Sequence, residues 1–403
     1  MNRKLRPLSL VALAVVLASC DHLTTGAVPH PAGASGQDKS LVRYSAPSGP
    51  SRRVASVRAN CGAVPDGFAR CFSLVRTDAF ARTFPDQSGY GPSDLQAAYK
   101  LPSVTAGSGQ TVAVVDAYDD STAESDLQIY RSHFSLPDCT TANGCFSKVN
   151  QRGDPQPLPG QDSGWAAEIS LDLDMVSAVC PNCHILLVEA DDASNKSLGK
   201  SVDTAARLGA NAISTSFGSS EIGSRMFERH YFHPGHMITA SIGDNGVNVS
   251  FPGSSPDVTA VGGTTLIRAH NRRGWTDAIW SGVSPQCSAV YPKPSWQVNT
   301  GCAMRASGDV GAVADPNTGV TVVFRNQFAV FGGTSVSSPI IAGVYALAGN
   351  SSTLHFGQHS YNNLKDLFTV RGFTSHSCAN ACRDSQGYTG STGNGTPHGV
   401  GAF

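Results

Sequence analysis

Apolar and polar positions are arranged along the chain in blocks that predict an α/β fold. Short, nearly continuous apolar runs are typical of strands covered on both faces, and they occupy Thr111–Tyr118, His184–Glu189, Asn211–Ser214, Met237–Ser241 and Val258–Val261. Between them lie segments with helical character, namely Ser93–Lys100, Glu124–Phe134, Gly164–Ala178 and Ser197–Leu208. The repeated strand–helix–strand order predicts a mostly parallel central sheet with helices on both faces. In such sheets, functional sites gather at the carboxyl ends of the strands.

The first twenty residues predict export. Three basic residues precede an apolar run over residues 8–18, which is too short to span a bilayer as a helix. This arrangement is typical of a secretory signal, and its end at Cys20 is similar to a bacterial lipobox, in which the cysteine becomes lipidated. We therefore expect an extracytoplasmic envelope protein with a lipid anchor on Cys20. The alternative is an ordinary signal peptide, cut nearby, and a secreted protein.

The cysteine count supports this location. Eleven cysteines are present, and without Cys20 the other ten fall into close pairs: Cys61/Cys71, Cys139/Cys145, Cys180/Cys183, Cys287/Cys302 and Cys378/Cys382. Because export favours disulfides, we expect five local ones, although spacing alone does not fix their connectivity. The alternative at Cys180 and Cys183 is a zinc site with His184, which lacks a second ligand pair at the usual spacing.

Composition divides the chain into four parts. Residues 1–19 form the signal, and residues 20–60, rich in Ser, Gly, Pro, Ala and Arg, are expected to form a disordered tether. Residues 61–88 are a short lead-in, and residues 89–403 form one large domain. The chain has 29 Lys and Arg against 30 Asp and Glu, a balance that argues against a nucleic-acid partner or a polybasic membrane contact.

A glycine-rich turn before an apolar helix offers a place for a nucleophile. The stretch Phe331–Pro339 reads FGGTSVSSP and runs into the apolar segment Ile340–Ala348. Ser335 follows the turn, and we expect Pro339 in the first turn of the helix, where no amide donor is needed. A helix N-terminus favours developing negative charge. The alternative is a Gly-Ser-rich loop that only caps a buried helix.

Histidine is the usual base for a serine nucleophile. None of the twelve histidines stands in a His-Gly-Thr-like helix start. His184 opens an apolar strand, and His230, His233 and His236 cluster around Pro-Gly in what we interpret as a loop. A Ser-His-Asp hydrolase is therefore kept only as an alternative function.

Carboxylates are better candidates than histidines for the base that would activate Ser335. Glu168 and Asp172 are four residues apart, so they share one face of a predicted helix and can reach each other. Two carboxyl groups in a partly buried place repel when both are ionised, so they tend to share a proton. A third acid, Asp244, follows a predicted strand. The alternatives are a solvated acidic helix face and, for Asp244, an Asx turn.

These stretches together resemble the sedolisins, the serine-carboxyl peptidase family. The matching motifs are Glu168-x-x-x-Asp172, Ser-x-Gly-Asp244 and Gly-Thr-Ser335-x-Ser-x-Pro, in the family's order. The resemblance covers about residues 89–403 and implies a subtilisin-like α/β fold. It also implies an endopeptidase that acts on polypeptides at acidic pH. In that reading Ser335 is the nucleophile and Glu168 its base, Asp172 holds Glu168, and a protonated Asp244 serves the oxyanion.

The resemblance extends to the substrate cleft. The segment Ser214-Thr-Ser-Phe-Gly218 resembles the stretch that lines the cleft in that family. It makes Ser214, Ser216 and Gly218 candidate substrate-binding residues.

The family's calcium site is altered in this chain. That site uses two aspartates near the C-terminus, and alignment places Thr369 and Thr389 where they belong. Calcium prefers six to eight oxygen ligands with carboxylates among them. We therefore expect no cofactor, unless Asp366 or Asp384 supplies the missing acid.

Control of activity and the possibility of a non-enzymatic role stay open. Many sedolisins carry a long folded prosegment, whereas only about seventy residues separate Cys20 from Gly89 here. How the enzyme would be restrained is therefore not evident. A non-catalytic peptide-binding lipoprotein on the same fold is the second alternative. We expect a monomer.

Overall fold

The computed structural model describes residues 41–42, 56–78, 89–244, 249–283, 285–298, 300–370 and 387–403. The predicted signal, Cys20, the pair Cys378/Cys382 and Asp384 lie outside these residues. Within the described ranges, no helix is both long and apolar enough to cross a membrane.

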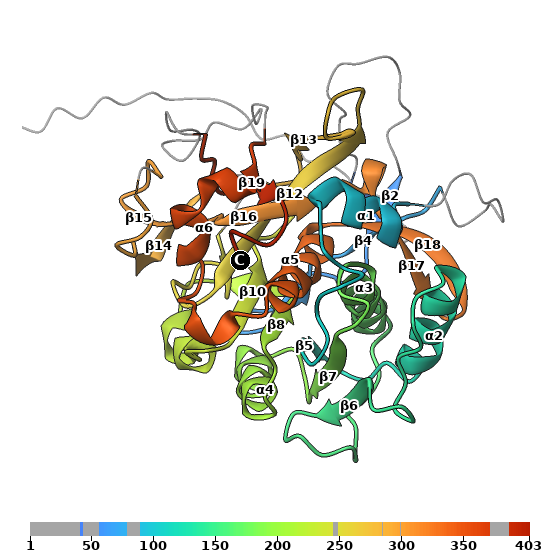
Figure 1. The fold of residues 1–403 in the computed structure, drawn as a ribbon. Helices are drawn as coiled ribbons and strands as arrows, with labels where there is room; N and C mark the ends of the chain where they lie inside the picture. Colours follow the sequence, from blue (N-terminus) through green and yellow to red (C-terminus); the bar gives the residue numbers. More distant parts are fainter. Residues whose placement is uncertain are drawn as a thin grey trace, which may run out of the picture. The chain divides into compact units, whose positions relative to one another are not determined.

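An eight-stranded sheet forms the centre of the domain (Figure 1). In chain order its strands are β5 (Thr111–Ala117), β6 (Phe146–Asn150), β7 (His184–Ala190), β8 (Ala212–Thr215), β10 (Met237–Ser241), β12 (Thr259–Arg268), β13 (Trp275–Ile279) and β16 (Val310–Val313). Their spatial order is β13-β12-β10-β8-β5-β7-β6, with β16 also paired to β12. Among these described strands, all pairings are parallel except that of β12 with β13. The predicted mostly parallel sheet is confirmed.

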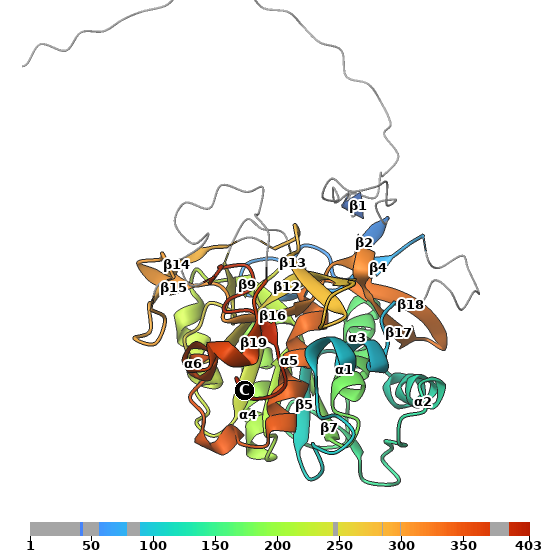
Figure 2. The same ribbon diagram turned by 45° about the horizontal axis from the view of Figure 1, so that its top comes forward.

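Helices cover both faces of this sheet (Figures 1 and 2). One face carries α3 (Ser163–Val179) and α5 (Thr334–Ala348), with α1 (Pro92–Tyr99) and α2 (Ala123–His133) packed beside α3, and the other carries α4 (Asn195–Arg207). Along β5, Val112 and Val114 belong to the core on the α3 side, while Ala113 and Val115 belong to the core on the α4 side. This double burial explains why the strand is apolar at consecutive positions.

Smaller sheets flank the central one. A five-stranded sheet has the order β1 (Leu41–Val42), β2 (Val57–Ala59), β4 (Leu74–Arg76), β18 (Gln327–Gly332) and β17 (Val320–Phe324). A three-stranded sheet has the order β11 (Ser250–Phe251), β9 (Phe217–Ser220) and β3 (Arg70–Cys71). Two further pairs are β14 (Cys287–Pro292) with β15 (Met304–Ala306) and β19 (Leu367–Phe368) with β20 (Thr396–Pro397). The remaining elements are α6 (Gln358–Asn362) and 3₁₀ helices at Ser224–Tyr231, Pro316–Thr318, Ser351–Thr353 and Leu364–Asp366.

The strands β1 and β2 fall within residues 20–60, the segment that the sequence predicts to be a disordered tether. They are paired instead, β1 with β2 and β2 with β4. Val57 is buried in this sheet. At these positions, backbone pairing and a buried valine outweigh the polar, glycine-rich composition of the segment as a whole.

Four disulfides are present among the described residues: Cys61–Cys71, Cys139–Cys145, Cys180–Cys183 and Cys287–Cys302. Each joins the two cysteines that the sequence pairs. The bond between Cys180 and Cys183 excludes the zinc alternative at that position, because a zinc ligand has to be a free thiolate. Local disulfides of this kind are typical of proteins outside the cytoplasm.

Helix α5 begins at Thr334, so the prediction that Pro339 lies in its first turn is wrong. A proline inside a helix removes the hydrogen bond to the carbonyl four residues earlier, here that of Ser335. Ser216 Oγ lies 3.3 Å from this carbonyl oxygen and offers it a hydrogen bond, which it shares with the shorter one to Asp172 Oδ2 at 2.7 Å. The helix therefore continues through the proline, and Ser335 itself lies in the first turn.

Candidate active site

Ser335 lies directly behind a tight glycine turn. Gly333 has a φ of 98°, and a Cβ added there would lie 2.0 Å from Phe72 O and 2.6 Å from Asp244 Oδ2. Both the backbone angle and the crowding require glycine. The Ser335 side chain is fully buried. Its Oγ donates to the Ser216 carbonyl oxygen at 3.0 Å and accepts from the Phe72 N–H at 3.1 Å.

Glu168 and Asp172 are carried by α3, which packs against α5. Both side chains are fully buried, whereas the sequence predicts only partial burial. Asp172 Oδ2 accepts from Ser216 Oγ at 2.7 Å and from Ser214 Oγ at 3.4 Å. Glu168 Oε2 accepts from the Ser73 N–H at 3.2 Å. The other carboxylate oxygen of each acid has no hydrogen-bond partner among the described residues.

Burial raises the pKa of both acids. The pKa of Glu168 rises to about 8, although hydrogen bonding by Ser335 and Ser73 opposes the rise. The pKa of Asp172 rises because the group is buried and because Glu168 lies nearby. In this fully buried site, both groups therefore favour the protonated form well above the usual carboxyl range.

Asp244 follows β10 and faces the N-terminus of α5. Its Oδ1 accepts from the N–H and the Oγ1 of Thr334, at 2.7 and 2.8 Å. The side chain is thus tied to the helix that carries Ser335, which excludes a purely local Asx turn. Burial raises the pKa of Asp244 to about 7, against the effects of the Thr334 bonds and of the positive charge of Arg70.

A fourth buried acid, Asp116, was not among the predicted site residues. It lies near the carboxyl end of β5, opposite Glu189 of β7, and is fully buried. Neither of its carboxylate oxygens has a hydrogen-bond partner in the described part of the chain. Burial raises its pKa, and the nearby Asp172, Glu168 and Glu189 raise it further. The signal was present in the sequence, since an acid inside a continuous apolar strand has to be buried.

Sequence reasoning also missed the segment 70–73, which covers the site. β3 pairs antiparallel with β9, and the Phe72 N–H extends this pairing to the Ser216 carbonyl oxygen at 3.3 Å. Phe72 and Ser73 are themselves almost fully buried. Ser335 and Glu168, the predicted nucleophile and base, therefore each contact the backbone of this segment.

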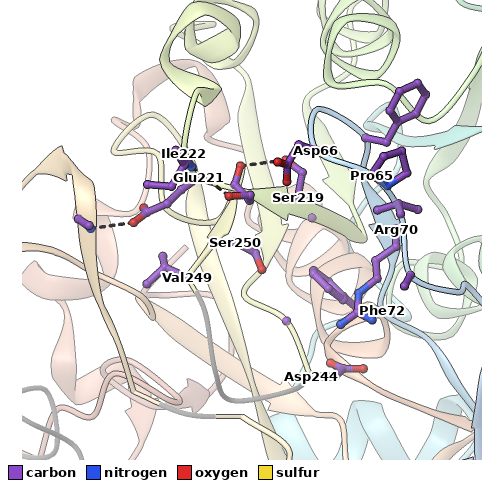
Figure 3. A pocket seen from close by; sticks show the side chains of 17 residues that line it. Pro65, Asp66, Arg70, Phe72, Ser219, Glu221, Ile222, Asp244, Val249 and Ser250 are labelled. Carbon is purple, nitrogen blue, oxygen red and sulfur yellow. Dashed lines mark hydrogen bonds between the residues drawn. The ribbon is translucent and has the colours of Figure 1, made fainter. Parts of the chain in front are cut away.

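A cavity of about 620 Å³ opens beside Asp244, and Figure 3 shows Arg70 and Phe72 on its wall. Gly218 also lines the cavity. It packs closely against the Phe72 ring, which would lie 2.6 Å from a Cβ at this position. Ser214 has a different place, because its hydroxyl is directed to Asp172 in the core. Of the three predicted substrate-binding residues, Gly218 faces the cavity, Ser216 offers its carbonyl to Phe72, and Ser214 supports Asp172.

The positions aligned with the family's calcium ligands do not form an acidic cluster. Thr369 is exposed, and Thr389 is buried with its Oγ1 2.9 Å from Thr392 Oγ1. The carboxyl group of Asp366 lies against Gly401. Within the described ranges, no group of three His, Cys, Asp or Glu is placed to hold a metal ion. These residues do not fit the oxygen-rich, carboxylate-containing shell that calcium needs.

The histidines considered as alternative bases have other partners. His230 Nδ1 and His233 Nε2 lie 2.6 and 3.0 Å from the carboxylate of Asp203 on α4, across the sheet from α5. His236 bonds the Ala210 carbonyl. His184 is exposed and bonds a loop carbonyl. None of these four histidines is a hydrogen-bond partner of Ser335.

Sequence comparison finds relatives of the domain that contains this site. The model of the Subtilase family matches residues 159–387, more than half of the chain. The chain is 27% identical over 297 residues to kumamolisin from Bacillus sp. (strain MN-32), covering 64% of this chain and 52% of kumamolisin. It is 26% identical over 317 residues to sedolisin from Pseudomonas sp. (strain 101), covering 68% and 53%. The chain thus spans about half the length of the curated relatives that it matches.

The fold is similar to that of a solved structure. Pseudomonas sedolisin, described as a serine-carboxyl proteinase complexed with two molecules of pseudo-iodotyrostatin, matches with a TM-score of 0.68 at 24% identity. The match covers 77% of this chain and 96% of that one, which confirms the predicted subtilisin-like fold. The chain belongs to the subtilase family, and its predicted relationship to the sedolisins is confirmed.

Proposed function

We propose that this protein is a serine-type endopeptidase of the serine-carboxyl kind, in which Glu168 and Asp172 take the place of a catalytic histidine. One observation carries the proposal. Ser335 Oγ and Glu168 Oε2 accept hydrogen bonds from the amides of Phe72 and Ser73, which belong to two consecutive peptide bonds. Ser335 and Glu168 thus lie side by side along one short backbone segment, and a nucleophile with a nearby base is what peptide hydrolysis needs.

The reaction follows from these positions. Ser335 Oγ attacks the carbonyl carbon of a bound peptide, and its proton passes to Glu168. Asp172, buried beside Glu168, opposes full ionisation of the pair and so keeps a proton available. Glu168 then protonates the leaving nitrogen, and water hydrolyses the ester to Ser335. A protonated Asp244, held by Thr334, donates to the oxyanion, where a placed donor stabilises the developing charge.

This chemistry belongs to acidic pH. The pKa of about 8 for Glu168 applies to the covered site. When water enters, the pKa falls toward its ordinary value of about 4.3, so Glu168 can accept a proton in acid, where a histidine would already be charged. Asp244 keeps its proton in the same range. We expect peptidase activity to be highest below about pH 6.

The Ser335→Ala variant tests the function. Hydrolysis of an unfolded, fluorescently labelled protein is measured from pH 3 to 8, and we expect the wild type to be active in acid and Ser335→Ala to be inactive throughout. Ser337→Ala is the matched control, because Ser337 is a buried serine of the same helix whose hydroxyl bonds the Thr334 carbonyl. An optimum near pH 8 that survives Glu168→Ala would favour a histidine base. A wild type inactive at every pH would favour a peptide-binding role.

Chelators are expected to have little effect on folding or activity. The reason is the absence of carboxylates at Thr369 and Thr389, which leaves too weak an oxygen shell for calcium. The melting temperature is measured with excess EDTA and again after calcium is added back. A fall of many degrees that calcium reverses would show that acids elsewhere form the site.

Cys20 is expected to carry lipid and to become the mature N-terminus. The basic residues, the apolar run and the cysteine that follows it motivate this expectation. Mass spectrometry of protein purified from membranes should give the mass of a chain starting at Cys20 plus acyl groups. A mature chain that starts beyond residue 20 would contradict it and favour a secreted form.

A further inference from the structure

We propose that Asp116 and Glu189 form a pH-sensitive switch in the central sheet, which keeps α3 packed on the sheet in acid and weakens this packing as the pH rises. Neither acid has a part in the reaction proposed above, so the inference does not rest on that function. It concerns the folded state itself, and it is tested by stability and not by activity.

The two acids lie on the face of the sheet that α3 covers. Side chains alternate between the two faces along a strand. Val114 of β5 belongs to the core on the α3 side, so Asp116, two residues later, points to the same side. Leu187 of β7 belongs to that core as well, which places Glu189 there too. Because Asp116 and Glu189 are partners in the parallel pairing of β5 with β7, their side chains are neighbours.

Both side chains are shielded from water. Asp116 and Glu189 have no exposed surface. Neither carboxyl oxygen of Asp116 has a hydrogen-bond partner among the described residues, and the same is true of Glu189 Oε2. An ionised carboxylate in such a place loses its water without a full replacement, whereas the protonated acid carries no charge to solvate. The geometry therefore favours the neutral form of both acids.

The surroundings supply more acids than cations. The titratable groups that face the two side chains come from α3, from the turn after β5 and from β6, and they are Glu168, Asp172, Asp119, Asp120 and Lys148. Within this described set Lys148 is the one cation, and its ammonium contacts both Asp119 and Glu189, the latter at 3.2 Å. One positive charge offsets one carboxylate. Asp119 is the more exposed of the two, so it carries the negative charge and Glu189 keeps its proton.

The pKa values of the two acids agree with this assignment. Burial raises the pKa of Asp116 well above its ordinary value, and the nearby Asp172, Glu168 and Glu189 raise it further. Burial raises the pKa of Glu189 to about 8, although the charge of Lys148 opposes the rise. In the unfolded chain, where water surrounds both acids, their pKa values are about 4.

The sign of the effect on stability follows from proton binding. Between the ordinary pKa of about 4 and the raised values in the fold, the folded chain holds protons that the unfolded chain has lost. The stability that depends on these two protons is therefore complete below about pH 4 and is lost as the pH rises toward about 8. Above that range, negative charge lies on β5 and β7 beneath α3, the helix that carries Glu168 and Asp172.

The experiment measures thermal unfolding of the full-length chain at pH 4.5 and at pH 8. Every chain carries Ser335→Ala, so that no peptidase activity can degrade the sample. Asp116→Asn and Glu189→Gln keep the size of the neutral acid but cannot ionise. We expect each to melt within a few degrees of its parent at pH 4.5 and at least about 5 °C above it at pH 8.

Lys148→Met tests the same switch in the opposite direction. It removes the cation that eases ionisation of Glu189, so its melting temperature should fall further below the parent at pH 8 than at pH 4.5. Asp191→Asn is the matched control. Asp191 directly follows β7, but it is exposed and pairs with Arg152 at 3.1 Å. Its difference from the parent should be the same at both pH values.

The three variants are measured separately, so the test does not depend on the folding of any one of them. Differences from the parent that grow with pH in the stated directions support the switch. It would be overturned if Asp116→Asn and Glu189→Gln followed the parent in parallel at both pH values, or if Asp191→Asn gained as much at pH 8 as they do.

Discussion

Replacing Glu168 by Gln is expected to lower kcat at acidic pH by about 10⁴-fold, the scale seen when a member of a catalytic serine triad is disabled. Glutamine has nearly the same shape and can still accept from the Ser73 amide, as Glu168 Oε2 does at 3.2 Å. It cannot take the proton of Ser335. The loss should therefore appear in kcat and not in the melting temperature, and steady-state kinetics on a labelled peptide together with thermal unfolding measure both.

Asp174→Asn is the matched control for this substitution. Asp174 is a buried acid on the same helix, but its Oδ2 accepts from the Val323 N–H at 2.8 Å. Its replacement should change stability and leave kcat within a few fold. If Glu168→Gln retained most of its activity, the base would have to be another group, and Asp116 would be a candidate, because it lies close enough to Glu168 and Asp172 for their charges to raise its pKa.

Much of the fold could be predicted because its signals are local. The apolar run from Thr111 to Ala117 is a strand whose consecutive residues enter two different cores, and this leaves a readable pattern in seven residues. The disulfides could be paired because their cysteines are near neighbours in the chain. The helix that carries Glu168 and Asp172 follows from its periodicity, and their common face from the spacing of four.

The parts that sequence reasoning missed depend on contacts between distant residues. Phe72 and Ser335 are 263 positions apart, and nothing near either residue indicates that they meet. Asp116 belongs to the site only because parallel pairing brings the end of β5 beside α3 and β7. The start of α5 was misplaced because the bond that compensates for the proline at the Ser335 carbonyl comes from Ser216, which lies between β8 and β9 and is distant in the chain.

Replacing Asp244 by Asn is expected to lower kcat by about 10²–10³-fold, as the loss of an oxyanion donor does in characterised serine peptidases. Asparagine keeps an oxygen for the Thr334 amide and offers an N–H where the Asp244 proton would be, but at a different length and angle. The substitution also removes a side chain that gains and loses a proton in this pH range. The pKa of Asp244 is raised to about 7, so the acid carries its proton below that pH and loses it above. Ionised, it can no longer donate, and its charge would repel the oxyanion.

The dependence of kcat on pH separates the altered donor geometry of Asp244→Asn from the loss of its titrating proton. In the wild type, the alkaline limb of kcat should include the loss of the Asp244 proton, and in Asp244→Asn that limb should flatten because the amide does not titrate. Asp257→Asn is the control, since burial also raises the pKa of Asp257 but its neighbouring charge is Arg305, not a group of the site. The profile of Asp257→Asn should match the wild type. If Asp244→Asn kept both the turnover and the alkaline limb of the wild type, the oxyanion donor would have to be sought among the backbone amides at the start of α5.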